Sequence, residues 1–280
     1  MEHINWYPGH MKKTKEMIQE NLKLVHVVIE LLDARLPLSS KNPVIDEIIR
    51  DKKRIVLLNK SDLADSKVTK QWVEYYSKRG IKAIPVNAIN GEGFNDLFKE
   101  LELENKIINE KSARKRQLRV MIVGIPNVGK SSLINKILGK KSTKTGNKPG
   151  VTRGKQWVNM REGIQLLDTP GILWPKFEDL EVGLKLAYVG SIKDEVINLE
   201  EVALKFLELM KANYKQELVE RYKLDDVETK TSLEMMEDIS KSRGFLLSGN
   251  RYDYARAART ILDEYRNGII GKISIERPTE

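Results

Sequence analysis

Five short apolar runs recur along the first part of this 280-residue chain. They cover residues 24–32, 54–58, 81–86, 118–123 and 164–167, and turn residues follow each of them. Nearly continuous apolar runs of this length predict strands that are buried on both faces, and the stretches between them carry helical patterns. Alternating strands and helices indicate an α/β fold, with a mainly parallel sheet that has helices on both faces.

No comparable run follows residue 175. Asn198 precedes apolar positions at helical spacing, and Glu201 follows it by three residues, which predicts the start of a helix. Residues 251–267 predict another helix, in which an apolar stripe lies opposite a basic one. The basic stripe consists of Arg256, Arg259 and Arg266. We therefore expect an α/β domain over 1–175, which includes an N-terminal helix, and a small all-helical C-terminal domain over 176–280.

The composition excludes several classes of protein. The chain has no cysteine, which excludes disulfides and every cysteine-based metal or redox site and fits a reducing cytoplasm. No stretch reaches about 18 consecutive apolar residues, and the first residues lack the apolar segment of a secretory signal. We therefore expect a cytoplasmic protein that has no membrane partner.

The net charge of +9 is distributed unevenly. Residues 176–280 hold 17 of the 49 basic residues and 21 of the 40 acidic ones, which leaves 32 and 19 to residues 1–175. Residues 136–155 carry seven Lys or Arg and no carboxylate. Such a run favours a polyanionic partner such as nucleic acid, although a solvated basic face has the same composition.

A phosphate-binding pattern lies between the fourth run and the helix that we expect at 130–138. Residues 124–131 read G-x-x-x-x-G-K-S. In this context the backbone N–H groups of the loop cradle phosphates at a helix N-terminus. Lys130 is expected to reach the β- and γ-phosphates, and the Ser131 hydroxyl to ligate Mg²⁺. The loop residues expected to bind the nucleotide are Asn127, Val128, Gly129, Lys130, Ser131 and Ser132.

Two short motifs follow other predicted strands. Residues 168–171 read DTPG, so that Asp168 is expected near Mg²⁺ and the Gly171 amide near the γ-phosphate, where no side chain obstructs it.

Residues 59–62 read NKSD. The Asp62 carboxylate can accept two hydrogen bonds that guanine donates and adenine does not, which disfavours an ATP-dependent enzyme. Asn59 and Lys60 are expected to brace the base and stack along it.

These motifs resemble those of the TRAFAC-class GTPases, in an unusual order. NKSD comes first, then Asn87 and Ala88, which resemble the second guanine-binding loop, then the P-loop, then residues 149–152, then DTPG. The common arrangement has the P-loop first. The chain therefore resembles a circularly permuted P-loop GTPase, a rearrangement that domain termini lying close together permit.

Within that class, residues 6–11 (WYPGHM) and 33–37 (DARLP) resemble motifs of the bacterial ribosome biogenesis GTPase A family, the YlqF type. The resemblance covers the whole chain. It implies a monomeric GTP hydrolase that binds the large (50S) ribosomal subunit, its rRNA and its proteins, in late assembly. Ribosome-stimulated hydrolysis would drive maturation and release, the C-terminal domain would bind rRNA, and Thr152 would join Mg²⁺ in the GTP state.

Catalysis needs a group that orients the attacking water. Many GTPases have a glutamine after DTPG, but here Ile172 follows, a hydrophobic substitution that the family shares. The resemblance assigns this role to His10. The alternative is a structural role, in which His10 caps a helix over 11–24 or packs beside Trp6. Asn127 resembles a potassium-coordinating asparagine, and an asparagine that only ties the loop to a switch segment is the alternative.

The missing glutamine keeps a second function open. A nucleotide-gated RNA-binding scaffold with negligible intrinsic hydrolysis would need the same nucleotide site. Turnover measured with and without large subunits distinguishes the two functions.

Overall fold

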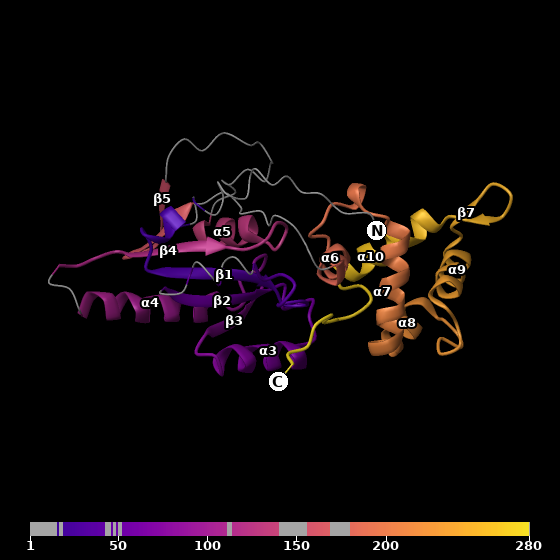
Figure 1. Cartoon of the computed structure of the whole chain (residues 1–280), viewed down its shortest axis with the longest axis horizontal. Coiled ribbons are helices and arrows are strands. Elements are labelled where there is room, and N and C mark those ends of the chain that lie inside the picture. Colours follow the sequence, from indigo (N-terminus) through magenta and orange to yellow (C-terminus); the bar gives the residue numbers. More distant parts are fainter. Residues whose placement is uncertain are drawn as a thin grey trace. The chain divides into compact units, whose positions relative to one another are not determined.

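The computed structural model describes residues 16, 19–42, 46, 49, 52–110, 114–139, 156–168 and 180–279. The chain divides into two compact units (Figure 1). The first contains residues 1–177 and 276–280, and the second contains residues 178–275. Residues 276–280, which we expected in the C-terminal domain, are thus part of the first unit.

The first unit is built on a six-stranded sheet with the strand order β3-β2-β1-β4-β6-β5 (Figure 1). Five strands run parallel, and β5 pairs with β6 in the antiparallel direction. The strands are β1 (Val27–Asp33), β2 (Lys53–Asn59), β3 (Lys82–Val86), β4 (Leu118–Val123), β5 (Gln156–Arg161) and β6 (Ile164–Asp168). The five predicted runs form the parallel strands, whereas β5 is an edge strand that we did not predict.

Among the helices of this unit whose bounds the structure describes, three flank the sheet: α3 (Ser66–Ser77), α4 (Phe94–Glu110) and α5 (Lys130–Leu138). Trp72 of α3 lies in a core cluster with Val56 and Leu58 of β2. Lys53 of β2 instead pairs with Glu104 of α4 at 2.7 Å. Because alternate residues of a strand point to opposite faces, α3 and α4 cover opposite faces of the sheet. The predicted layers are therefore confirmed.

The second unit is helical. Its helices are α6 (Leu180–Tyr188), α7 (Leu199–Asn213), α8 (Lys215–Tyr222), α9 (Ser232–Arg243) and α10 (Tyr254–Arg266), with a 3₁₀ turn at Asp194–Val196. Asn198 caps α7 as predicted, because its side chain accepts the Glu201 N–H at 3.2 Å. The core contains the Phe206 ring, whose centroid lies 5.3 Å from that of Tyr188 and 4.7 Å from that of Tyr265.

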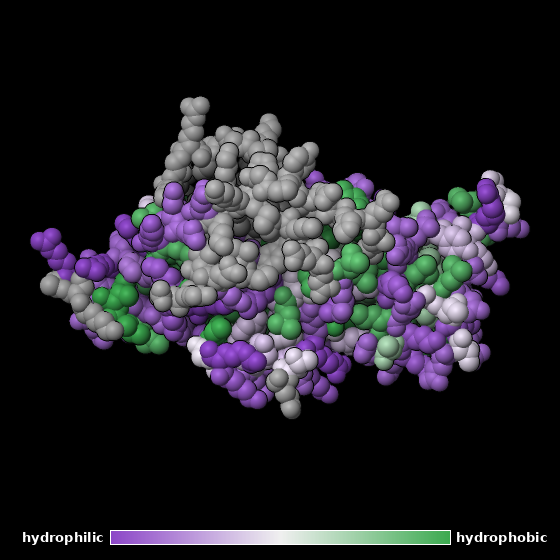
Figure 2. All heavy atoms as spheres, in the orientation of Figure 1, coloured by the Kyte–Doolittle hydropathy of each residue, from purple (hydrophilic) through white to green (hydrophobic). Residues whose placement is uncertain are grey.

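A short hairpin interrupts these helices. It joins β7 (Leu246–Leu247) to β8 (Arg251–Tyr252), so the expectation of an all-helical unit is wrong at this point. On the face shown in Figure 2, hydrophilic residues cover much of this unit, with apolar ones scattered between them. None of the helices in the described part of the chain has both the length and the apolar character to cross a membrane.

Candidate functional site

The predicted motifs meet at one edge of the sheet. Because the five parallel strands run in one direction, their carboxyl ends share that edge. Asn59 ends β2, Asn87 follows β3, Gly124 follows β4, and Asp168 ends β6. Segments that are far apart in the sequence thus converge where open α/β sheets bind their ligands.

Two glycines let the loop between β4 and α5 approach its neighbours closely. A Cβ added at Gly124 would lie 2.6 Å from the Leu31 carbonyl oxygen. Gly129 has a φ of +104°, and a Cβ there would lie 2.3 Å from Asn59 Nδ2. Both contacts are too short for a side chain, so the loop conformation depends on glycine at both positions.

Lys130, the first residue of α5, folds its side chain back over the loop. Its Nζ donates to the carbonyl oxygens of Gly124 and Ile125, the latter at 2.7 Å. Burial lowers the pKa of Lys130 to about 8, because the charged ammonium loses its hydration there. Among the described residues, no carboxylate pairs with this ammonium. A phosphate in the loop would supply the missing counter-charge.

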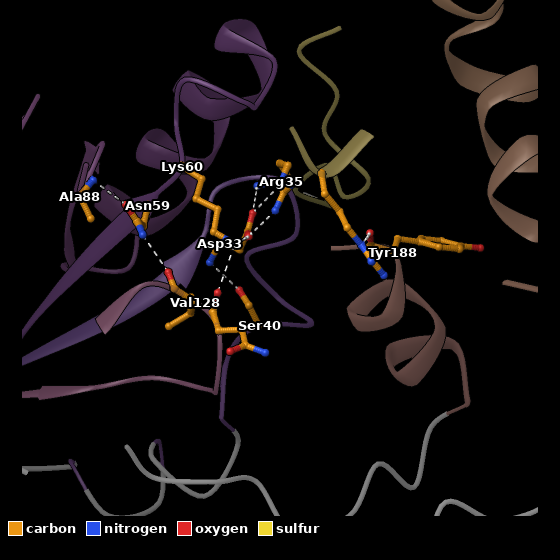
Figure 3. Close-up of polar contacts among 10 residues, drawn as sticks. Asp33, Arg35, Ser40, Asn59, Lys60, Ala88, Val128 and Tyr188 are labelled. Carbon is orange, nitrogen blue, oxygen red and sulfur yellow. Dashed lines mark hydrogen bonds and ion pairs between the residues drawn. The ribbon is translucent and has the colours of Figure 1, made fainter. Parts of the chain in front are cut away.

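The Asn59 side chain joins three segments (Figure 3). Its Nδ2 donates to the Val128 carbonyl oxygen at 2.7 Å, and its Oδ1 accepts the Ala88 N–H at 3.0 Å. Asn59 is only 2% exposed. One buried amide therefore connects the guanine motif at the end of β2 with the P-loop and with the second guanine-binding loop.

The rest of the guanine motif lies beside this bridge. Lys60 Nζ donates to the Asn127 carbonyl oxygen at 3.2 Å. The Ser61 hydroxyl donates to the Val86 carbonyl oxygen at 3.0 Å, which ties the motif to β3. Asp62 is partly exposed, and no residue that the structure describes donates a hydrogen bond to its carboxylate. That carboxylate is available to a base.

The second guanine-binding loop is shaped by Asn87. Its Oδ1 accepts the N–H groups of Ile89 at 2.8 Å and of Asn90 at 3.2 Å. The Ala88 N–H, from the same loop, donates to Asn59 Oδ1. Asn87 thus orders the loop, and Asn59 holds the Ala88 amide at the site.

The remaining predicted residues fall into two groups. Asn127, Ser131 and Ser132 are exposed at the loop and in the first turn of α5, where Ser131 can reach a metal ion. In the described ranges, no group of three Asp, Glu or His residues has the arrangement of a metal site. Outside the described residues lie His10, Thr152, Gly171 and the side chain of Asp168.

The basic stripe expected on α10 is smaller than the sequence indicates. Arg256 and Arg259 are exposed, whereas the Arg266 side chain is only 15% exposed and its guanidinium is hydrogen-bonded within the unit. It donates to the carbonyl oxygens of Ala187 at 2.9 Å and of Tyr188 at 3.1 Å, and it pairs with Asp194 at 2.8 Å. Arg266 therefore holds the end of α6, and the prediction that it belongs to the basic stripe opposite the apolar one is wrong.

Sequence reasoning missed the polar cluster behind the guanine motif. Asp33 at the end of β1 pairs with Arg35 at 2.8 Å and with Lys60 at 3.1 Å. Glu276 holds the next turn of the same loop. The DARLP segment was noted only for its resemblance; an Asp and an Arg two residues apart at the end of an apolar strand could have indicated a buried pair.

The fold and these contacts define the class of protein: a P-loop GTPase whose guanine motif precedes its P-loop. A family described as "50S ribosome-binding GTPase" matches residues 119–237. "Ribosome biogenesis GTPase A" of Bacillus cereus is 48% identical over 99% of this chain and 95% of its own length. The protein of that name from Thermotoga maritima is 36% identical over 99% and 95%. The chain belongs to the ribosome biogenesis GTPase A family, and it is a GTP hydrolase.

Solved structures agree. A GDP-bound structure of TM YlqF matches with a TM-score of 0.68 and 32% identity, over 94% of this chain and 100% of that chain. GNP-bound YlqF from T. maritima matches with a TM-score of 0.66 and 32% identity, over 96% and 99%. The permuted GTPase fold and the YlqF type that the motifs indicated are thus confirmed.

Proposed function

We propose that this GTPase binds the large ribosomal subunit late in assembly, hydrolyses GTP faster when bound, and then leaves the subunit. The relatives named for ribosome biogenesis and the family named for 50S binding support the ribosomal partner. The net positive charge of residues 1–175, with seven cations and no carboxylate over 136–155, suits rRNA as part of that partner.

The observation that carries the nucleotide part is the buried Asn59 bridge. It sets the guanine motif, the second guanine loop and the P-loop in one arrangement before a ligand arrives. In this arrangement Asp62 would read the base, and Lys130 would contact the β- and γ-phosphates. Such a preordered site loses less entropy on binding than a set of separate loops.

The metal ligands belong to the same proposal. Ser131 is exposed in the first turn of α5, which fits a hydroxyl ligand to Mg²⁺, and Thr152 and Asp168 would complete the surroundings of the ion. Mg²⁺, when bound, neutralises charge between the phosphates. Asn127 would hold K⁺ through its amide oxygen, and replacement of K⁺ by Na⁺ at constant ionic strength should then slow turnover.

Hydrolysis needs an oriented water. With Ile172 in place of a glutamine, we assign this role to His10. Gly171 would meet the γ-phosphate, so the loss of that phosphate would release the segment that leads into the second unit. Order and disorder of such segments is how GTPases report their nucleotide state.

The test combines binding with turnover. The protein loaded with a non-hydrolysable GTP analogue should sediment with large subunits, and the GDP form should not. GTP turnover should rise on addition of large subunits by about 10²-fold, the scale of a positioned water, and not on addition of small subunits. Charge reversal of Lys140, Lys141 and Lys144 should weaken the binding and flatten its dependence on salt.

Unchanged turnover with large subunits, together with GTP-dependent binding, would favour the scaffold function instead. Equal sedimentation of the GTP-analogue and GDP forms would contradict nucleotide-gated binding altogether.

A further inference from the structure

The loop that follows β1 places a buried acidic residue beside the guanine motif. In the sheet register Asp33 lies opposite Asn59, and the Ala34 N–H donates to the Asn59 carbonyl oxygen at 2.8 Å. Asp33 is 1% exposed. The parallel pairing of β1 with β2 thus fixes Asp33 next to the residue that precedes Lys60.

Two cations hold the Asp33 carboxylate (Figure 3). Its Oδ1 accepts Arg35 Nε at 2.9 Å and its Oδ2 accepts Arg35 Nη2 at 2.8 Å, while Lys60 Nζ lies 3.1 Å from Oδ2. Burial acts to raise the pKa of Asp33, but the charges of Arg35 and Lys60 outweigh it and hold that pKa far below its usual range. Asp33 is therefore an anion throughout the neutral range of pH.

Lys60 is constrained at its backbone and at its ammonium. Its φ of 57° lies in the left-handed region, which residues other than glycine rarely adopt. Its Nζ pairs with Asp33 and donates to the Asn127 carbonyl oxygen at 3.2 Å. The side chain is thus stretched between the end of β1 and the P-loop.

The loop that carries Asp33 is held by a distant part of the chain. The buried Glu276 carboxylate accepts the Leu38 N–H at 2.8 Å and the Ser39 N–H at 3.1 Å, and it also bonds the Ser39 hydroxyl. The Glu276 N–H donates to the Arg35 carbonyl oxygen at 3.2 Å. The position of Asp33 is therefore set by contacts that do not involve Lys60.

We infer that Asp33 is a positioning residue for guanine-nucleotide binding: its fixed carboxylate orders the Lys60 side chain along the place of the base. The inference rests on the proposed role of Lys60 in this site. Asp33 would act through Lys60 and would not itself touch the nucleotide. It raises affinity because Lys60 is already ordered before binding, so less conformational entropy is lost when the nucleotide binds.

A double-mutant cycle tests this. The rate at which a fluorescent GDP leaves the protein is measured for Lys60→Met, Asp33→Asn and the double variant. Each single variant should raise the rate by about 10- to 100-fold, the range of a hydrogen bond between charged groups. If Asp33 acts through Lys60, the double variant should match Lys60→Met within about twofold.

A matched control separates positioning from folding. Glu30 lies on the same strand, is equally buried and pairs with Arg54 of β2. Glu30→Gln should lower the melting temperature and leave the GDP dissociation rate unchanged. Because Asp33→Asn removes the negative charge that pairs with the buried Arg35, the cycle is repeated with Asp33→Asn/Arg35→Gln, which removes both charges.

The outcomes are distinct. If Lys60→Met leaves the rate unchanged, both the proposed role of Lys60 and the inference fail. If Lys60→Met raises the rate but Asp33→Asn and Asp33→Asn/Arg35→Gln do not, the inference alone is overturned. Effects that multiply in the double variant overturn it too, because Asp33 would then act without Lys60.

Discussion

Replacement of Asn59 by alanine should disconnect the two loops that form the nucleotide site. The substitution removes the donor to the Val128 carbonyl oxygen and the acceptor for the Ala88 N–H. Val128 is 1% exposed and Ala88 is 3% exposed, so water cannot readily replace either bond. The P-loop and the second guanine-binding loop would then lose the amide that connects them.

The magnitude follows from these two groups. A buried polar group without a partner costs about 1–3 kcal/mol, so two of them cost about 2–6 kcal/mol if nothing relaxes. Partial rearrangement of the two loops, which lie at the edge of the sheet, would reduce this cost. We therefore expect a loss of about 2–4 kcal/mol in the free energy of unfolding. Nucleotide affinity should fall by about 10- to 100-fold, because binding must then order both loops.

Asn109 provides the matched control. Its amide also joins two segments, since Nδ2 donates to the Arg116 carbonyl oxygen at 3.1 Å and Oδ1 accepts the Arg116 N–H at 2.7 Å. It does so on α4, away from the predicted motifs. Urea denaturation and titration with a fluorescent GDP are measured for Asn59→Ala and Asn109→Ala. Both should lose stability, and only Asn59→Ala should lose nucleotide affinity.

Equal affinity losses in the two variants would refute this reasoning, because the loss would then follow from stability alone. Unchanged affinity in Asn59→Ala would show that the bridge does not order the site.

Further perturbations test the phosphate site, the stability of the second unit and the group that orients the attacking water. Nucleotide affinity should fall as the pH rises through about 8, because the phosphates bind the protonated Lys130, whose pKa is about 8 before binding and higher afterwards. A flat profile between pH 7 and 9 in titrations would contradict this. Arg266→Ala should lower the free energy of unfolding by about 2–4 kcal/mol in urea denaturation, and Arg259→Ala, on the exposed side of the same helix, by less than about 0.5 kcal/mol. His10→Ala should leave nucleotide affinity unchanged and lower ribosome-stimulated turnover by about 10²-fold in a phosphate-release assay, and unaffected turnover would assign the water to another group.

The parallel strands were predictable because each is buried on both faces, and such strands form continuous apolar runs. β5 was not, since its sequence QWVNMR mixes polar and apolar residues without a continuous apolar run and it lies at the edge of the sheet. β1 begins at Val27 and not at Leu24, because Leu24 ends the preceding turn through its N–H bond to Asn21. Apolar character alone does not separate a strand from the turn before it.

The parts of the site that consist of short, continuous sequence motifs were predictable. The P-loop, NKSD and the Asn87–Ala88 pair are short segments, and the sheet topology brings them together. Asp33 was missed although Arg35 follows it by two residues, because its second partner, Lys60, comes beside it only in the folded sheet. Glu276 was missed because it contacts Ser39 across 237 residues of sequence. Arg266 looks solvent-facing along its own helix, but the end of α6 covers it.

A change of base specificity tests most directly whether these contacts form a guanine site. Asp62→Asn replaces the carboxylate that would accept two guanine hydrogen bonds by an amide, which suits xanthine, where a carbonyl replaces the amino group. The variant should bind GDP at least about 10²-fold more weakly than the unaltered protein and bind xanthosine diphosphate more tightly, with an unchanged melting temperature. Equal GDP affinity in the variant and the unaltered protein would mean that Asp62 does not read the base, and that the site assembled around Asn59 is not the guanine site.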